Sequence, residues 1–116
     1  KGIGLAIVTA ILEEHDDTFV LLGARDPDRG EAARGSLVQA HPAWAGRIEV
    51  VELDVASEAS VTAAARHVAA RFIEELTPLH AVVNNAGIGS NRTTPRDVLA
   101  VNTFGMRRVC EAFVPL

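Results

Sequence analysis

This 116-residue sequence contains no tyrosine, and lysine, cysteine and tryptophan each occur only once. The single thiol, Cys110, excludes an internal disulfide, which is compatible with a reducing compartment. No apolar run approaches the roughly 20 residues that span a bilayer, so we expect no membrane segment. The four histidines are scattered without metal-ligand spacing, so the sequence predicts no metal site. A net charge of −4 without a basic cluster disfavours nucleic acid and membrane surfaces as partners, and we expect a cytoplasmic protein.

The composition is that of a folded domain, because 48% of the residues are hydrophobic and 22% are charged. Hydrophobic periodicity and capping signals predict four helices that alternate with three strands. The predicted helices are Ile3–Leu12, Pro27 to about His41, a long helix from Ser57 and a last helix from Thr94 towards Phe113, and the predicted strands are Phe19–Gly23, Arg47–Leu53 and Leu79–Val83. Such alternation is typical of α/β proteins with a doubly wound parallel sheet, here as a single domain over residues 1–116.

Two expectations concern packing. The continuous apolar run Phe19–Gly23 is typical of a strand that is covered on both faces. The helix after Ser57 is expected to bury one apolar stripe along its whole length. That stripe consists of Val61, Ala65, Val68, Phe72 and Leu76.

The strand over Ala81–Val83 ends in two amides, a small residue and a glycine, Asn84-Asn85-Ala86-Gly87. At the carboxyl end of a parallel strand, this composition provides a polar floor on which a flat ligand can lie against the backbone. The string closely resembles the motif after the fourth strand of short-chain dehydrogenases/reductases. The resemblance implies a partial Rossmann-type fold that lacks its first strand and its carboxyl-terminal half, and it implies nicotinamide chemistry.

Two further segments carry the resemblance. Lys1-Gly2-Ile3-Gly4 is similar to the tail of the family's glycine motif, and we predict that these four residues bind the cofactor. Glycines at a helix start let phosphate oxygens approach the free N–H groups, although ordinary turn chemistry and a solvated terminal lysine are the alternatives. Val101-Asn102-Thr103-Phe104-Gly105 resembles the family's Asn-x-x-Gly segment, which implies that Asn102 is a catalytic residue anchoring a proton-relay water. The alternative for Asn102 is a core amide bonded to a nearby carbonyl.

Arg25 follows the predicted strand Phe19–Gly23 at the point where such folds meet the adenosine ribose. An acid there binds the 2′-hydroxyl, whereas an arginine pairs with a 2′-phosphate, so Arg25 predicts NADP (NADPH) as the cofactor. Asp26 could supply an acid, but before Pro27 it is better suited to cap a helix.

The remaining cofactor contacts come from two strand ends. Asp54 matches the family's acid beside the adenine ring, with the Val55 backbone contributing; the alternative is an acid that bonds nearby backbone amides. The resemblance places Asn85, Ala86 and Gly87 along the ribose and nicotinamide, and it gives Asn84 a structural role between strands. Cys110 is expected to pack rather than react.

The resemblance implies an oxidoreductase fragment whose parent transfers hydride between NADP(H) and a small-molecule carbonyl or alcohol, close to the NADPH-dependent carbonyl reductases. The family's Tyr-x-x-x-Lys pair is not in this sequence, and Ser90 lies in the wrong loop for the family's serine. Two alternatives stay open: a non-catalytic dinucleotide-binding regulatory module and a ligand-free interaction protein. The substrate and any homo-oligomeric assembly of the parent also stay open.

The fragment interpretation has a structural consequence. In the strand order 3-2-1-4-5-6, the first strand separates Phe19–Gly23 from Ala81–Asn84. We therefore expect either a gap between these two segments or a collapse that pairs them directly. With its strand edges exposed, the isolated chain is expected to fold poorly, to aggregate and to be inactive as a reductase.

Overall fold

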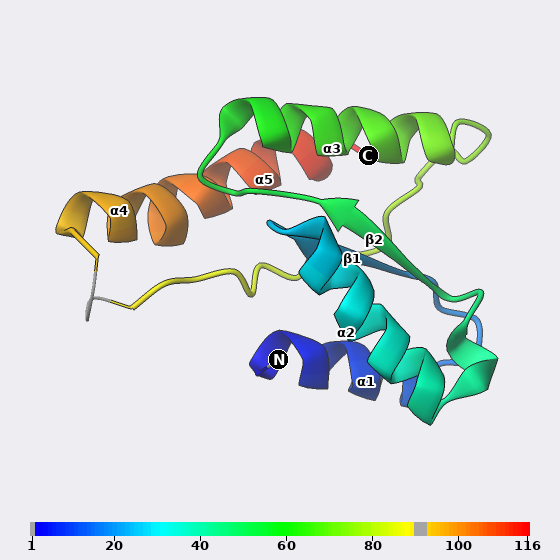
Figure 1. Ribbon diagram of the computed structural model, residues 1–116. Coiled ribbons are helices and arrows are strands. Elements are labelled where there is room, and N and C mark those ends of the chain that lie inside the picture. Colours follow the sequence, from blue (N-terminus) through cyan, green and yellow to red (C-terminus); the bar gives the residue numbers. More distant parts are fainter. Residues whose placement is uncertain (1, 90–92) are drawn as a thin grey trace. The chain divides into compact units, whose positions relative to one another are not determined.

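The computed structural model describes residues 2–89 and 93–116 as an α/β protein with a parallel sheet (Figure 1). Contacts within the chain define two compact units, residues 1–53 and 54–116, each of which has its own architecture. The first unit contains α1 (Ile3–Glu14), β1 (Val20–Ala24), α2 (Pro27–Ala40), the 3₁₀ turn η1 (Pro42–Trp44) and β2 (Ile48–Glu52). The second contains α3 (Glu58–Arg71), α4 (Pro95–Leu99), the π-helical segment η3 (Ala100–Gly105) and α5 (Met106–Phe113).

The sheet of the first unit consists of β1 and β2, which pair in parallel from Val20 opposite Ile48 to Ala24 opposite Glu52. The sequence predicted parallel strands at Phe19–Gly23 and Arg47–Leu53, and β1 and β2 confirm both the positions and the parallel direction. The expectation that the strand Phe19–Gly23 is covered on both faces was wrong, because Gly23 is exposed and the rest of β1 is only half-buried. Among the described residues, β1 pairs with β2 alone, so its other edge is open.

The hydrophobic core of the first unit joins both helices to the sheet. It consists of Val8, Leu12, Leu37, Trp44 and Ile48, with Leu5, Val20 and Leu22 packed against it. The indole of Trp44 is buried and stacks on the exposed His41 ring, with 3.9 Å between ring centroids. Trp44 therefore closes the end of α2, as expected for a large apolar side chain in this connection.

Arg47, just before β2, supports the turn between α1 and β1. Its guanidinium donates to the carbonyl oxygens of Thr18 at 3.1 Å, Leu12 at 3.3 Å and His15. The last carbonyls of a helix lack partners within the helix and lie at the negative end of its dipole. Arg47 thus satisfies the carboxyl end of α1 and connects it to the start of β2.

The close packing of α2 on the sheet depends on Gly30, which is buried. A Cβ at this position would lie 2.6 Å from Val50 Cγ1 and 2.8 Å from Ala24 Cβ. Both distances are shorter than any normal contact, so only glycine permits this approach. Gly35, in the same helix, has nothing within 4 Å of the corresponding position.

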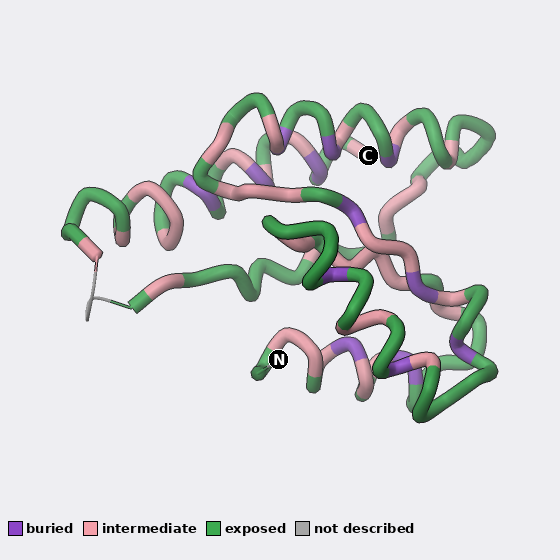
Figure 2. The backbone as a smooth tube through the Cα atoms, viewed as in Figure 1, coloured by how far each residue is buried: buried purple, intermediate pink, exposed green. Residues whose placement is uncertain are grey.

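In the second unit, α3 begins at the predicted cap, since Ser57 Oγ accepts from Ser60 N–H at 3.2 Å. The helix ends at Arg71, earlier than the predicted stripe requires. Its buried residues are Val61, Ala64 and Val68, whereas Leu76 is fully exposed. The expected stripe was wrong at Ala65, which is only half-buried while Ala64 is buried. It was also wrong beyond Val68, because Phe72 is already the carboxyl cap and residues after it no longer follow the helical period. The buried residues lie along α3 where it packs against α5 (Figure 2).

The predicted strand Leu79–Val83 is not a strand in this structure. Residues 79–89 have neither helix nor strand assignment, and Val83 is 56% exposed. A strand exists only through pairing, and neither β1 nor β2 pairs with this segment. The expected collapse, in which Phe19–Gly23 and Ala81–Asn84 pair directly, is therefore not observed. The strand that the doubly wound order places between these two segments would come before Gly2, and it is not among these residues.

The last helix confirms its predicted start. Thr94 and Asp97 form a reciprocal capping box, with Asp97 N–H donating to Thr94 Oγ1 at 3.2 Å and Thr94 N–H donating to Asp97 Oδ2 at 3.1 Å. The hydrogen bonds from the Thr94 hydroxyl and backbone hold the pKa of Asp97 below its usual value. From Pro95 to Phe113 the chain is helical throughout, and η3 widens its middle turn.

Substitution of the two α2 glycines by alanine should have opposite effects. Gly30→Ala should destabilise the fold by about 1–3 kcal/mol, because the new methyl group overpacks the contact with β1 and β2. Gly35→Ala should stabilise it by about 0.5–1 kcal/mol through helix propensity. The free energy of unfolding of both variants is measured with urea. The protein used is the shortest piece of the full-length chain that unfolds cooperatively. Equal effects at the two positions would contradict the close approach at Gly30.

Candidate functional site

The amino end of α1 has the geometry expected of an anion-binding turn. Gly2 is the amino-terminal cap residue with φ 83°, a conformation that side-chain-bearing residues rarely adopt. Within residues 2–89 and 93–116 no side chain caps the helix, so the N–H groups of its first turn lack side-chain partners there. Gly2, Ile3 and Gly4 therefore leave backbone donors open to phosphate oxygens. The predicted contact at Lys1 lies outside the described residues.

Arg25 follows β1 directly and is exposed, and it forms no hydrogen bond or ion pair with the described part of the chain. Asp26, beside it, is occupied, because its Oδ1 accepts from the N–H groups of Asp28 at 3.1 Å and Arg29 at 3.2 Å. Asp26 is thus the cap of α2, as the sequence indicated. Arg25 is left as the charged side chain at this strand end that is available to a ligand.

In the second unit, Asp54 begins a tight turn between β2 and α3. Its Oδ1 accepts from Ala56 N–H at 3.0 Å, and its own N–H donates to Ser60 Oγ at 2.9 Å. The carbonyl oxygen of Asp54 accepts from Ser57 N–H at 3.0 Å. These three bonds make residues 54–57 a defined turn. Oδ1 of Asp54 thus bonds a nearby backbone amide, which is the alternative role that the sequence left open for this acid. Its other carboxylate oxygen, Oδ2, makes no hydrogen bond within the described residues.

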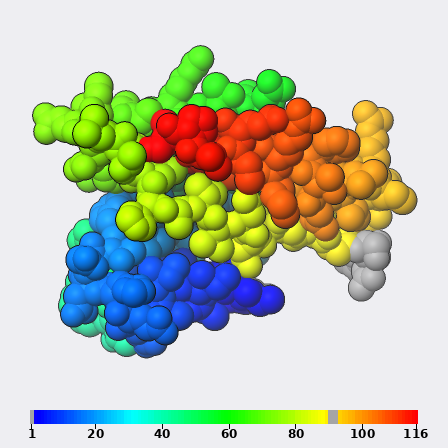
Figure 3. Space-filling model, turned by 180° about the vertical axis from the view of Figure 1, so that it is seen from behind, coloured from blue at the N-terminus to red at the C-terminus, as the bar shows by residue number. Residues whose placement is uncertain are grey.

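Residues 84–89 lie against the last helix, where the space-filling view shows them beside α5 (Figure 3). Asn84 Nδ2 donates to Cys110 Sγ at 3.4 Å, and Asn85 N–H donates to Val83 O at 3.1 Å, forming a tight turn. Asn85, Ala86 and Gly87 are all exposed. Their backbone and the Asn85 amide are therefore accessible to a ligand.

Asn102 fixes this loop through both ends of its amide. Its Oδ1 accepts from Ile88 N–H at 2.9 Å, and its Nδ2 donates to Ile88 O at 2.9 Å. The pair of bonds resembles one rung of a β-ladder made by a side chain. A Cβ at Gly87 would lie 3.4 Å from Asn102 Oδ1, so a small residue suits this position. The oxygen and the nitrogen of the half-buried amide each have one backbone partner, as the core alternative requires.

Asn102 lies in the π-helical segment η3, and π-helical turns inside α-helices frequently occur at functional sites. A regular helix would place Gly105, Met106 and Val109 on one face with Asn102, at three- and four-residue spacings. Gly105 and Val109 are buried, but Met106 is 47% exposed. The extra residue in the widened turn shifts the helical register after Asn102, which explains why a regular 3.6-residue period misplaced Met106.

Two contributors were not predicted from the sequence. Ile88 takes part through its backbone, for which a sequence has no signal. Arg108 donates from one guanidinium nitrogen to the carbonyl oxygens of Val55 at 3.5 Å and Ala100 at 3.4 Å. An arginine side chain on a helix is usually solvated. No feature of the sequence therefore distinguished Arg108 from its neighbour Arg107.

The predicted residues thus form two groups, one in each unit. Gly2, Ile3, Gly4 and Arg25 belong to the first unit; Asp54, Val55, Asn85, Ala86, Gly87 and Asn102 belong to the second. In the second unit, one helix contacts both of the predicted cofactor-binding segments, through Asn102 to Ile88 and through Arg108 to Val55. Ser90 lies outside the described residues.

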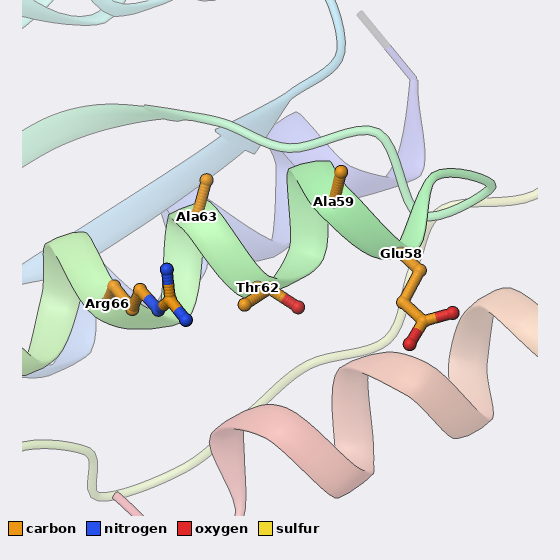
Figure 4. A pocket seen from close by; sticks show the side chains of 5 residues that line it. All are labelled: Glu58, Ala59, Thr62, Ala63 and Arg66. Carbon is orange, nitrogen blue, oxygen red and sulfur yellow. The ribbon is translucent and has the colours of Figure 1, made fainter.

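A separate hollow lies on α3, lined by Glu58, Ala59, Thr62, Ala63 and Arg66 (Figure 4). All five residues come from one helix, so the hollow has a wall on one side only and is an open surface. Within residues 2–89 and 93–116, no three histidine, cysteine or acidic side chains gather as a metal site would need. The helices of the same residues are all too short or too polar to cross a membrane.

Comparison with known proteins places these features in a family. The model of the short chain dehydrogenase family matches residues 1–116. The chain is 35% identical over 125 residues to the 3beta-hydroxysteroid dehydrogenase dhs-16 of Caenorhabditis elegans, a match that covers all of this chain and 31% of that protein. It is 29% identical over 141 residues to the (+)-neomenthol dehydrogenase of Arabidopsis thaliana, covering all of this chain and 46% of that protein. The chain therefore spans about a third to a half of these relatives.

Solved structures agree. The NADPH-bound carbonyl reductase from chicken fatty liver superposes with a TM-score of 0.80 at 30% identity, covering 99% of this chain and 47% of that one. A short-chain dehydrogenase from Streptomyces avermitilis superposes with a TM-score of 0.65 at 28% identity, covering 97% of this chain and 39% of that one. With the glycine turn at Gly2, the loop after Asn84 and the Asn102 contact in place, the chain belongs to the short-chain dehydrogenase/reductase family.

Proposed function

We propose that this chain is the cofactor-binding half of an NADP-dependent oxidoreductase that acts on the carbonyl or alcohol group of a small molecule. The observation that carries the proposal is the pairing of the Asn102 amide with the backbone of Ile88. It connects the exposed loop Asn85–Gly87 to the π-helical segment, where the family's Asn-x-x-Gly motif lies. Family membership supports the reaction class.

Arg25 supports NADP rather than NAD. Its guanidinium is exposed at the end of β1 and forms no bond with the described residues, while Asp26 is occupied as a helix cap. A free arginine at this strand end suits a 2′-phosphate, whereas an acid would suit a 2′-hydroxyl. The chicken carbonyl reductase with which the chain superposes is NADPH-bound.

The chain's own residues would bind and orient the cofactor. The open N–H groups after Gly2 would hold the pyrophosphate, and the turn at Asp54 and Val55 would hold the adenine. The loop Asn85–Gly87 would lie along the ribose and nicotinamide. When bound, NADP(H) supplies the hydride chemistry, and these residues fix its position.

Asn102 would act as a catalytic residue by holding a water for proton transfer. An amide oxygen has two acceptor positions and an amide nitrogen carries two hydrogens. The Ile88 backbone uses one of each. One acceptor and one donor therefore stay available on a side chain that the loop already holds in place.

The sequence contains no tyrosine and no lysine after Lys1, so the proton donor of the proposed enzyme would come from residues beyond this sequence. We propose a cytoplasmic location and no nucleic-acid or membrane partner, consistent with the charge of −4. No observation favours the regulatory module or the interaction protein over the oxidoreductase.

The cofactor preference can be tested at Arg25. In the full-length protein, Arg25→Asp should weaken NADPH binding by about 1.5–3 kcal/mol, roughly tenfold to a hundredfold, through the loss of a charge-assisted phosphate contact. NADH binding should change little. Arg66→Asp, at an exposed position on α3, makes the same change in net charge and serves as the control. Equal losses for both cofactors would remove Arg25 from the 2′-phosphate site.

The role of Asn102 can be tested by two measurements on Asn102→Leu. The loop loses its tether, so amide hydrogen exchange at Ile88 should accelerate, and turnover should fall by up to about a hundredfold as the reacting groups lose their alignment. Thr103→Val, at the next and exposed position, is the control. If the leucine variant melts earlier but keeps full turnover when folded, Asn102 is a core residue only.

The fragment interpretation predicts the behaviour of the isolated 116-residue chain. It should show no NADPH-dependent reductase turnover, because the tyrosine and lysine of the family are not among its residues. It should also aggregate through the open strand edges. Turnover assays and sedimentation of the isolated chain, compared with the full-length protein, measure both properties. A monomeric, cooperatively folded and active chain would contradict the interpretation.

A further inference from the structure

The helix that carries Asn102 also contacts the turn at residues 54–57, at a second place and by different means. Gly105 and Arg108 both meet Val55. Val55 lies in the turn that would hold the adenine, whereas Asn102 holds the loop that would lie along the nicotinamide. The same helix is therefore in direct contact with both ligand-facing segments of the second unit.

The first contact is a close approach of backbones. A Cβ at Gly105 would lie 3.0 Å from both the carbonyl oxygen and Cγ2 of Val55. Gly105 is buried, and these distances are tighter than nine in ten real Cβ contacts. The glycine lets the helix lie directly against the turn, so the position of the helix limits where the Val55 backbone can be.

The second contact is directional. Arg108 Nη1 lies between two carbonyl oxygens, 3.5 Å from that of Val55 and 3.4 Å from that of Ala100, the first residue of η3. Both bonds are long, so each alone is weak. Together they attach a permanently charged donor to the turn and to the π-helical segment at once.

The turn can transmit this contact because it is internally braced. Asp54 Oδ1 accepts from Ala56 N–H, and Asp54 N–H donates to Ser60 Oγ. Because these bonds connect the residues of the turn, we expect the turn to move as a unit. A displacement of the Val55 carbonyl group would then also displace the Asp54 carboxylate.

Burial on the two helices is carried by apolar side chains rather than by Arg108. The helices α3 and α5 pack against each other, and their buried residues include Val61 and Val68 on α3 and Val109 and Phe113 on α5. Arg108 is only half-buried, and its hydrogen bonds go to the carbonyl oxygens of Val55 and Ala100. Its removal should therefore change the orientation of the turn more than the stability of the unit.

We propose that Arg108 is a positioning residue for the adenosine half of the cofactor: it holds the Val55 carbonyl, and with it the Asp54 turn, against the helix that carries Asn102. The proposal rests on the proposed function, because it concerns the same cofactor site. Arg108 itself does not touch the reacting atoms.

The experiment separates the two halves of the cofactor. Dissociation constants for NADPH, adenosine 2′,5′-bisphosphate and reduced nicotinamide mononucleotide are measured with the full-length protein and with Arg108→Met. The variant should bind NADPH and adenosine 2′,5′-bisphosphate about three- to tenfold more weakly. Binding of the mononucleotide and kcat at saturating NADPH should stay unchanged. Hydrogen exchange at the Ala56 amide should accelerate.

Arg107→Met is the matched control, because Arg107 is the adjacent residue on α5, is exposed and pairs only with Glu111 among the described residues, at 2.7 Å. It should leave all three dissociation constants at the wild-type values. If Arg108→Met does not fold, Arg108→Gln removes the charge and shortens the side chain while staying polar, and it should weaken the same two ligands.

The outcomes are distinguishable. If the wild-type protein binds NADPH but folded Arg108 variants match Arg107→Met, this inference is wrong and the proposed function stands. Equal weakening of the adenosine and mononucleotide ligands also overturns it, because a general loosening would then explain the effect. If the wild-type protein binds none of the three ligands, the proposed function fails and the inference fails with it.

Discussion

The two hydrogen bonds between the Asn102 amide and the Ile88 backbone are the interaction on which the candidate site of the second unit depends. Residues 79–89 pair with no strand of the described structure, so their backbone groups need other partners. A side-chain amide can replace a ladder partner, because it presents one acceptor and one donor at the spacing of a peptide group. This exposed loop is thus held at Ile88 although it belongs to no sheet.

A second constraint is the distance at which helices meet backbone. Gly30 lets α2 lie against β1 and β2, and Gly105 lets the last helix lie against Val55. In each case a methyl group would approach atoms to 3.0 Å or less. Gly35 shows that the residue type alone does not imply this role, because it faces open space. The role of a glycine is set by what lies opposite it.

Much of the fold could be predicted because its signals are local. Asp26, Ser57 and Thr94 cap the helices that follow them, since capping involves atoms at most three residues apart. The third predicted strand failed because a strand depends on distant partners, and the stripe ending at Leu76 failed because α3 already ends at Arg71. Of the candidate site, the glycine turn and the occupation of Asp26 followed from the sequence. The Ile88 contact and the role of Arg108 did not, because they join residues 14 and 53 positions apart.

The sequence by itself determined the family, the alternation of helices and strands as far as α3, the helix starts and the chemical types present at each strand end. These properties follow from motifs and from contacts within a few residues. The tertiary structure decided which carbonyl each arginine contacts, which glycines are close to other backbone, and that the amide of Asn102 is bonded to Ile88. These depend on the path of segments far apart in the chain, and η3 shows that one extra residue in a turn can move a side chain such as Met106 out of the face that a regular helix gives it.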